Sequence, residues 1–123
     1  MPTVRARHVA TGLLAATVFI AGCGDSPVPA RGDRLDVSMR EFHLTPTSTR
    51  ARTGRLRIVA RNTGTVGHQL ALGRGRFALA RTPIMAVGGR ATLDVRLPPG
   101  HYRLFCTLSN HDTLGLYGSL VVR

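Results

Sequence analysis

The chain has 123 residues and a mass of 13.2 kDa, which suffices for one small domain and is too little for two of ordinary size. Its 17 basic residues are all arginines and outnumber the 6 acidic residues, so the net charge is +11. Fourteen glycines, seven prolines and no tryptophan argue against a helical bundle, while 43% hydrophobic residues argue against a disordered polyelectrolyte. Two cysteines are too few for a disulfide-stapled scaffold or a four-cysteine zinc site. The composition therefore favours a compact, β-rich domain.

Residues 1–22 have the pattern of a signal peptide. A short basic region precedes the apolar residues 9–22, and this apolar run is too short to span a bilayer stably. The run ends in Ile20-Ala21-Gly22-Cys23, which resembles a bacterial lipobox. This predicts cleavage before Cys23 and acylation of its sulfur, giving a lipoprotein anchored at the periplasmic or extracellular face of the membrane. The alternative is an ordinary secretory signal with a coincidental cysteine, and both interpretations predict export.

Residues 23–34 are interpreted as the lipidated N-terminus and a flexible tether, because they contain two prolines, two glycines and few large apolar groups. Without residues 1–22, which carry two arginines and no acid, the charge is 15 − 6 = +9. Anionic lipid headgroups or an acidic protein partner would complement this charge. Nucleic acid is not expected as a partner, because the protein is exported and has no basic cluster interleaved with aromatic residues.

From Leu35 onward, apolar and polar residues alternate with period two, which is the signature of strands that bury one face. The alternation is clear in the segments 35–40, 55–61, 70–72, 93–97, 102–106 and 120–122. Turn residues such as Pro98-Pro99-Gly100 separate the segments, and within residues 76–85 at most a short helical turn fits. Six or seven short strands in residues 35–123 predict one all-β domain, a Greek-key β-sandwich or barrel.

Three side chains with metal-binding chemistry are predicted to meet at one end of this domain. Cys106 ends a strand pattern with its side chain on the buried face, and His111 follows across a short loop. His68 follows a glycine-punctuated turn at the start of another strand. One thiolate and two imidazoles form a soft three-coordinate site, which suits copper because sulfur stabilises Cu(I) and imidazole supports both oxidation states.

The spacing of these residues resembles that of the cupredoxins, the blue-copper proteins of the plastocyanin type, over essentially the whole mature domain. The motifs that carry the resemblance are Glu41-Phe42-His43-Leu44-Thr45-Pro46, Asn62-x-Gly64-x-x-x-His68 and Pro99-Gly100-x-Tyr102-x-x-x-Cys106-x-x-x-x-His111-x-x-x-Gly115-Leu116-x-Gly118. The resemblance implies a cupredoxin-type fold that holds one copper ion cycling between Cu(I) and Cu(II). It also implies that Cys106, His68 and His111 bind the ion, and that Asn62 forms hydrogen bonds between the ligand loops.

One position departs from the family pattern. Where the family usually has a weak axial methionine, this chain has Leu116, which cannot coordinate a metal. The site should therefore be close to trigonal, and the missing thioether should raise the reduction potential. The backbone carbonyl of Gly67, next to His68, is a further candidate for a weak axial donor. Met39 is predicted to lie in the core, whereas Met85 lies in an apolar loop that the periodicity does not place.

These features predict a monomeric electron carrier without substrate turnover, and hence not an enzyme. The fixed ligand frame would limit reorganisation, and single electrons would pass through the edge of His111 to and from redox proteins that dock transiently. The apolar patch predicted around this edge consists of Leu108, Leu114 and Leu116. His43 and His101 fall on polar positions and are predicted to be ordinary surface residues.

Two other functions stay open. One is copper handling, in which the protein captures Cu(I) and delivers it, although the exposed Met- and His-rich sites typical of that role are sparse. The other is a metal-free adhesion or assembly module. A zinc enzyme or a Cys-His nucleophile is less well supported, because carboxylate pairs are nearly absent and a cysteine buried at a strand end is a poor nucleophile.

Overall fold

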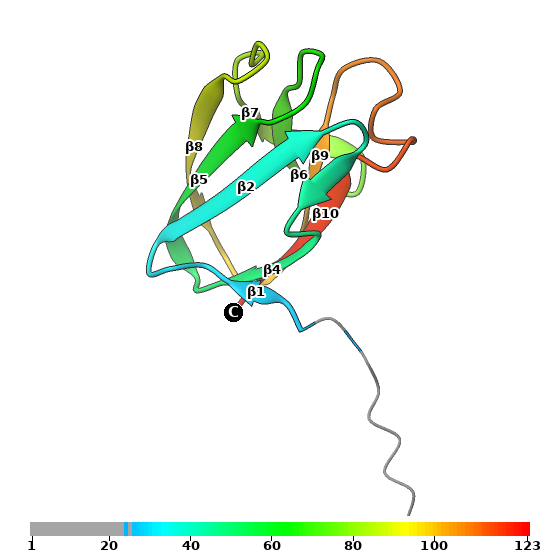
Figure 1. The fold of residues 1–123 in the computed structure, drawn as a ribbon. Helices are drawn as coiled ribbons and strands as arrows, with labels where there is room; N and C mark the ends of the chain where they lie inside the picture. Colours follow the sequence, from blue (N-terminus) through cyan, green and yellow to red (C-terminus); the bar gives the residue numbers. More distant parts are fainter. Residues whose placement is uncertain (1–23, 25) are drawn as a thin grey trace, which may run out of the picture.

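A computed structural model describes residues 24 and 26–123 of the chain (Figure 1). The ten strands are β1 (Val28–Pro29), β2 (Arg34–Arg40), β3 (His43–Thr45), β4 (Ser48–Ala51), β5 (Gly54–Asn62), β6 (Leu70–Arg74), β7 (Phe77–Arg81), β8 (Arg90–Leu97), β9 (Gly100–Cys106) and β10 (Tyr117–Val122). In this part of the chain, no helix is long and apolar enough to cross a membrane. The predicted signal peptide, residues 1–22, and the predicted lipidation site, Cys23, lie outside the described residues.

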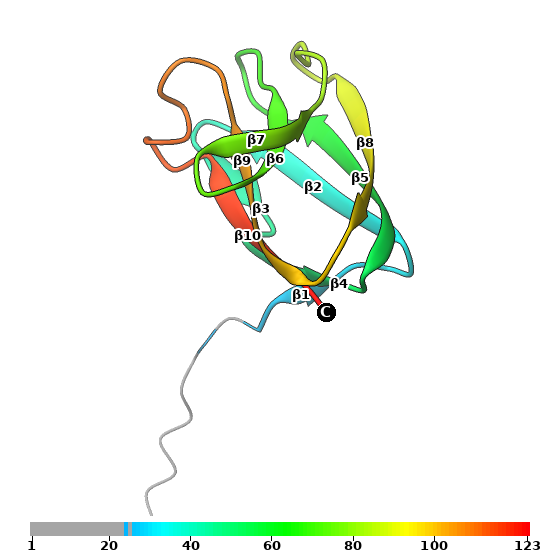
Figure 2. The ribbon, with the colours of Figure 1, turned by 180° about the vertical axis from the view of Figure 1, so that it is seen from behind.

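The strands form two sheets that face each other (Figures 1 and 2). One sheet has the order β1-β4-β10-β9-β6-β7, and the other has the order β3-β2-β5-β8. Both sheets are mixed, because β2 pairs with β5 in parallel and β4 pairs with β1 and β10 in parallel, while the other pairs are antiparallel. The predicted all-β sandwich is confirmed.

The core lies between the sheets and consists of the apolar members of the alternating segments. In β2, for example, Leu35, Val37 and Met39 are buried and their neighbours face outward. Burying a side chain of this size contributes about 1.5–3 kcal/mol relative to leaving it exposed, so the alternation also fixes the register of each strand. Met39 is fully buried, as predicted, and His43 and His101 are exposed, also as predicted.

Residues 76–85, where the sequence allowed at most a short helical turn, contain strand β7 (Phe77–Arg81) instead. β7 pairs with β6 through a two-residue turn in which Gly75 has a φ of +58°. A glycine at the first position of such a turn is a hairpin signal that the sequence contains. Hydrophobic periodicity missed the strand because its large apolar residues, Phe77 and Leu79, face solvent.

Strand β1 lies within residues 23–34, the segment that the sequence analysis interprets as a tether. Val28 and Pro29 pair in parallel with Thr49 and Arg50 of β4, and the Ala30 N–H donates to the Arg50 carbonyl at 2.8 Å. The predicted tether therefore contributes an edge strand. A strand of two residues is too short to show an alternation of apolar and polar side chains.

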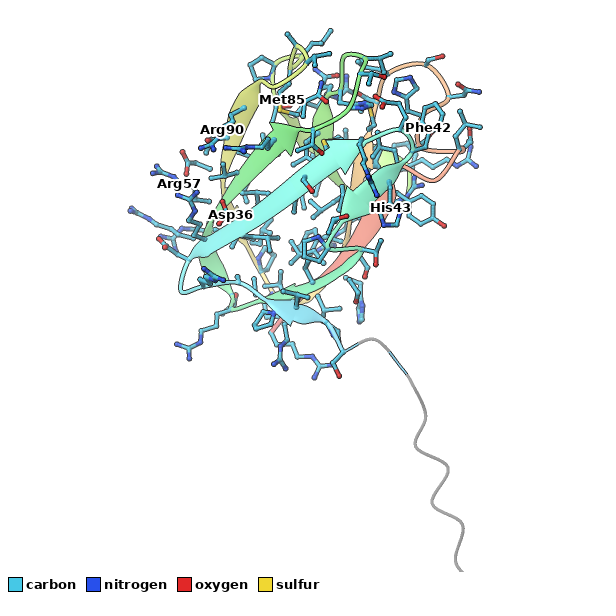
Figure 3. All side chains as sticks on the ribbon, in the orientation of Figure 1. Asp36, Phe42, His43, Arg57, Met85 and Arg90 are labelled. Carbon is cyan, nitrogen blue, oxygen red and sulfur yellow. The ribbon has the colours of Figure 1, made fainter. Side chains whose placement is uncertain are left out.

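The loops after β5, β7 and β9 gather at one end of the sandwich, opposite β1 and the C-terminus (Figures 1 and 2). Phe42 and Met85 lie at this end, whereas Asp36 and Arg57 point outward from the sheet that contains β2 and β5 (Figure 3). The fold thus brings together three loops that are far apart in the sequence, and the candidate site lies among them.

Candidate metal centre

His68, Cys106 and His111 converge at this end of the sandwich. The Cys106 Sγ lies 4.0 Å from the His68 Nδ1 and 3.6 Å from the His111 Nδ1. All three donor atoms lie within 4.8 Å of one another. His68 and Cys106 are buried and His111 is partly buried, so the cluster lies just beneath the surface.

These separations fit three ligands around one metal ion. With metal–nitrogen and metal–sulfur bonds of about 2.0 and 2.3 Å, trigonal geometry places nitrogen and sulfur roughly 3.7 Å apart. The two sulfur–nitrogen distances, 3.6 and 4.0 Å, lie on either side of this value. Two imidazoles and one thiolate in a trigonal arrangement are the donor set of electron-transfer copper sites.

The loop between β9 and β10 carries two of the three donors and is closed by its own backbone. The Cys106 N–H donates to the Leu116 carbonyl and the Leu116 N–H donates to the His111 carbonyl, both at 3.0 Å. An ion pair between Arg103 of β9 and Asp112, at 3.4 Å, ties the outer part of the loop to the sheet. The loop therefore holds Cys106 and His111 in fixed relation to each other.

Gly115 allows this loop to pack against the β2–β3 turn. Its φ of +121° lies in a region that side chains rarely adopt, and a Cβ at this position would lie 2.9 Å from the Phe42 carbonyl oxygen. The Phe42 ring in turn lies 5.1 Å from the His111 ring, centroid to centroid. A glycine is thus required where the two segments meet.

Leu116 is fully buried in the hydrophobic core. It presents no donor atom to the site, as expected, but it does not contribute to a surface patch. The prediction that Leu116 surrounds the His111 edge is therefore wrong. The exposed apolar side chains at this end include Phe42, Val66 and Leu114, with exposed fractions of 37%, 44% and 51%.

His68 is fixed by its neighbours on a different loop. It pairs with Met85 in a two-way bridge, in which the Met85 N–H donates to the His68 carbonyl at 2.7 Å and the His68 N–H donates to the Met85 carbonyl at 3.2 Å. Met85, which the sequence did not place, is a buried residue of the core. Gly67, immediately before His68, lies against Ile84, and its role as a weak axial donor stays a prediction.

Asn62 holds the loop that precedes His68, but its hydrogen-bond partners differ from the predicted ones. Its Nδ2 donates to the carbonyls of Val66 at 2.7 Å and Met85 at 3.0 Å, and its Oδ1 accepts from the Gly64 N–H at 2.9 Å. Among the described residues, none of these bonds reaches the loop after Cys106. Asn62 therefore joins the His68 loop to Met85 and does not join the two ligand loops.

Two residues that the sequence analysis missed link the ligand loops instead. The Thr107 hydroxyl donates to the Gln69 side-chain oxygen, and the Thr107 N–H donates to the Gln69 carbonyl at 3.4 Å. Thr107 directly follows Cys106, and Gln69 directly follows His68. The sequence indicated this contact only in that each of the two residues directly follows a predicted metal-binding residue.

A third missed residue is Glu41, whose Oε1 lies 2.9 Å from the Nε2 of His68. The Thr65 N–H donates to both oxygens of this carboxylate at 3.0 Å, and together with the Val66 N–H it lowers the pKa of Glu41 to about 2. Burial lowers the pKa of His68, although the Glu41 carboxylate opposes this effect. Burial therefore favours the neutral imidazole, which is the form that binds a metal ion.

Comparisons with known proteins agree on the fold. The sequence matches no protein-family model and no curated protein. Among solved structures, reduced auracyanin from the photosynthetic bacterium Roseiflexus castenholzii superposes with a TM-score of 0.68 at 19% identity, covering 75% of this chain and 98% of that one. Auracyanin A, described as a "blue" copper protein from Chloroflexus aurantiacus, gives 0.66 at 18% identity over 77% and 99%. Reduced rusticyanin gives 0.60 at 16% identity over 85% and 89%.

These structural similarities confirm the fold that the sequence motifs predicted. The chain has the cupredoxin fold. At this level of identity the likeness concerns the fold alone, so the chemistry of the site must be argued from its own residues.

Proposed function

We propose that this chain is a type 1 (blue) copper protein that carries single electrons between redox partners outside the cytoplasmic membrane. The observation that carries the proposal is the convergence of the His68 Nδ1, the Cys106 Sγ and the His111 Nδ1 on one point of a cupredoxin fold. One copper ion bound there would supply a one-electron couple, Cu(I)/Cu(II), and nothing in this role requires substrate turnover.

The protein's contribution is to keep the ligands fixed. Cys106 and His111 are joined through Leu116, and His68 is held through Met85, so neither half of the site rests on a free loop. Both His68 and Cys106 are withdrawn from water. A rigid, dry frame lowers the cost of rearrangement when the charge of the site changes, which favours fast electron transfer.

His111 is the proposed electron port, because it is the ligand nearest the surface. Phe42 contacts its ring, and Val66 and Leu114 expose apolar surface at the same end of the molecule. A small apolar patch suits transient docking, and the strong positive charge of the chain would favour an acidic partner. The electron would pass by an outer-sphere route through the His111 edge.

The proposed location and state rest on the sequence. Export by residues 1–22 and acylation of Cys23 would anchor the domain to the outer face of the membrane, in the periplasm or at the cell surface. We propose that the domain acts there as a monomer.

Copper handling is the second candidate function, but the methionines weigh against it. Both methionines in the described part of the chain, Met39 and Met85, are buried, with exposed fractions of 0% and 3%. Capture and delivery of Cu(I) would need soft ligands that a partner can reach. A metal-free interaction module is the third candidate, and it gives no reason for a thiol and two imidazoles to share one buried point.

The visible and electron paramagnetic resonance spectra of the Cu(II)-loaded protein test the proposal. All ten strands of the described residues begin at or after Val28, so a chain starting at Gly24 retains both described sheets. An electron carrier should show an intense thiolate-to-copper band that bleaches reversibly on reduction. Tight Cu(I) binding without this band would support the copper handler, and no copper binding would support the metal-free module. The control is Cys106→Ala, which should abolish the band.

A further inference from the structure

Glu41 occupies the turn between β2 and β3, 27 residues before His68 in the chain, and reaches the site from outside. Its side chain is 25% exposed, whereas the side chain of His68 is fully buried. The buried His68 Nε2 needs a hydrogen-bond partner, and among the described residues the structure gives it the Glu41 carboxylate. A carboxylate at this place satisfies the nitrogen and also brings a charge close to the site.

The Glu41 carboxylate lies in a cradle formed by Gly64, Thr65 and Val66. It accepts hydrogen bonds from the backbone N–H groups of Thr65 and Val66, at 3.0 and 3.1 Å, and from the Thr65 hydroxyl at 3.3 Å. Gly64 leaves room for it, because a Cβ on Gly64 would lie 2.8 Å or less from three atoms of the Glu41 carboxyl group. Charge-assisted bonds of this kind fix an anion firmly, so Glu41 differs from a mobile surface acid.

The two nitrogens of the His68 ring face different partners. Nε2 lies 2.9 Å from the Glu41 Oε1, and Nδ1 points toward the Cys106 Sγ at 4.0 Å. A carboxylate only accepts hydrogen bonds when ionised, so Nε2 must carry the proton and donate it to Glu41. The lone pair of the neutral ring then lies on Nδ1, which is the atom that faces the Cys106 Sγ.

We propose that Glu41 is a positioning residue that fixes His68 in its metal-binding tautomer and lowers the reduction potential of the copper site. This inference rests on the proposed function. An anion separated from the site by one imidazole ring stabilises Cu(II) more than Cu(I), because the oxidised site carries one more positive charge. Glu41 thus opposes the effect of Leu116, which lacks a thioether to favour Cu(II).

The test of the electrostatic part is the reduction potential of Glu41→Gln, measured by voltammetry on the copper-loaded chain. Glutamine keeps the shape and an acceptor oxygen but removes the charge. We expect the ratio of Cu(II) to Cu(I) affinity to fall about tenfold or more, which raises the potential by about 59 mV for each factor of ten. Asp94→Asn is the matched control, because it removes the same charge from the outer face of the β5–β8 pair and should leave the potential unchanged.

Gly64→Ala provides a second variant that retains the carboxylate. The added methyl group would push the flexible end of Glu41 out of its cradle, so the potential should rise in the same direction. If both variants keep the thiolate-to-copper band and neither changes the potential, the proposal is overturned while the electron carrier stands. If the wild-type chain itself shows no such band, the proposed function fails, and the effect of Glu41 on the potential fails with it.

Nitrogen-15 NMR of the metal-free chain tests the tautomer without copper. His68 should carry its proton on Nε2 in the wild-type protein and in Glu41→Gln, and Gly64→Ala should lose the hydrogen bond of this proton. A proton on Nδ1 in the wild-type protein would overturn the assignment of Glu41, whatever metal the site binds.

Discussion

Cys106 and Leu116 are hydrogen-bonded to each other across the base of the ligand loop, with the Cys106 N–H donating to the Leu116 carbonyl at 3.0 Å. The side chain of Leu116 is fully buried in the core and offers no donor atom. The backbone of residue 116 thus closes the loop between β9 and β10. Its side chain is leucine, where the family resemblance implies a methionine.

Replacing Leu116 by methionine should lower the reduction potential. A weak axial donor supplies electron density that the more highly charged Cu(II) ion needs more than Cu(I) does, and the exchange of two side chains of similar volume should cost less than about 1.5 kcal/mol of stability. Voltammetry of Leu116→Met against the wild-type chain measures the shift. Leu120→Met makes the same exchange at a fully buried position of β10 and should leave the potential unchanged. Equal potentials in all three proteins would show that position 116 does not tune the site.

Asn62→Ala should destabilise the metal-free protein by about 2–3 kcal/mol, because it leaves buried polar groups without partners. Asn62 is fully buried, and its side chain serves the carbonyls of Val66 and Met85 and the N–H of Gly64. Urea unfolding measures the loss. Asn110→Ala, in the exposed ligand loop, is the control and should change stability much less. A similar loss in both variants would contradict the role given to Asn62.

Leu114→Lys should slow electron self-exchange between oxidised and reduced copies of the protein by about tenfold, because it places a charge in the proposed docking patch. NMR line broadening in mixtures of the two oxidation states measures this rate. Leu79→Lys adds the same charge at a similarly exposed position on β7 and serves as the control. If Leu79→Lys slows exchange as much as Leu114→Lys does, the patch around His111 is not the port.

The Arg57–Asp94 pair predicts part of the acid sensitivity of the domain. Arg57 donates to Asp94 across β5 and β8 at 2.7 Å, and this hydrogen bond holds the pKa of Asp94 below its ordinary value of 3.8. A carboxylate whose pKa is lowered by folding stabilises the protein above its unfolded-state pKa, and this contribution is lost as the pH falls through the folded-state pKa. Asp94→Asn should therefore lose slightly less stability than the wild-type protein when the pH is lowered below 3.8. Because both side chains are exposed, the difference should also shrink at high salt. Identical acid unfolding curves would contradict this account.

The convergence of His68, Cys106 and His111 could be predicted from the sequence because its signals are local. Cys106 and His111 lie on one short loop, and His68 follows a recognisable turn, so a family spacing was enough to bring them together. The alternation of apolar residues in β2, β5 and β9 similarly indicated which faces are buried.

The supporting contacts could not be predicted because they depend on how distant segments pack. Glu41 contacts the far nitrogen of His68 from a turn on the opposite sheet, and the motif at residues 41–46 gave no indication of that contact. Thr107 and Gln69 meet only because β6 and β9 are neighbours in register. The edge strands β1 and β7 escaped detection because β1 has only two residues and β7 exposes its large apolar residues to solvent.

The most direct test of the account is a crystal structure of the copper-loaded chain with anomalous scattering data at the copper edge. We expect one ion bonded to the Cys106 Sγ, the His68 Nδ1 and the His111 Nδ1, with Leu116 contributing no ligand. An ion located elsewhere, or an ion that lacks the sulfur ligand, would contradict the assignment of this site as a blue copper centre.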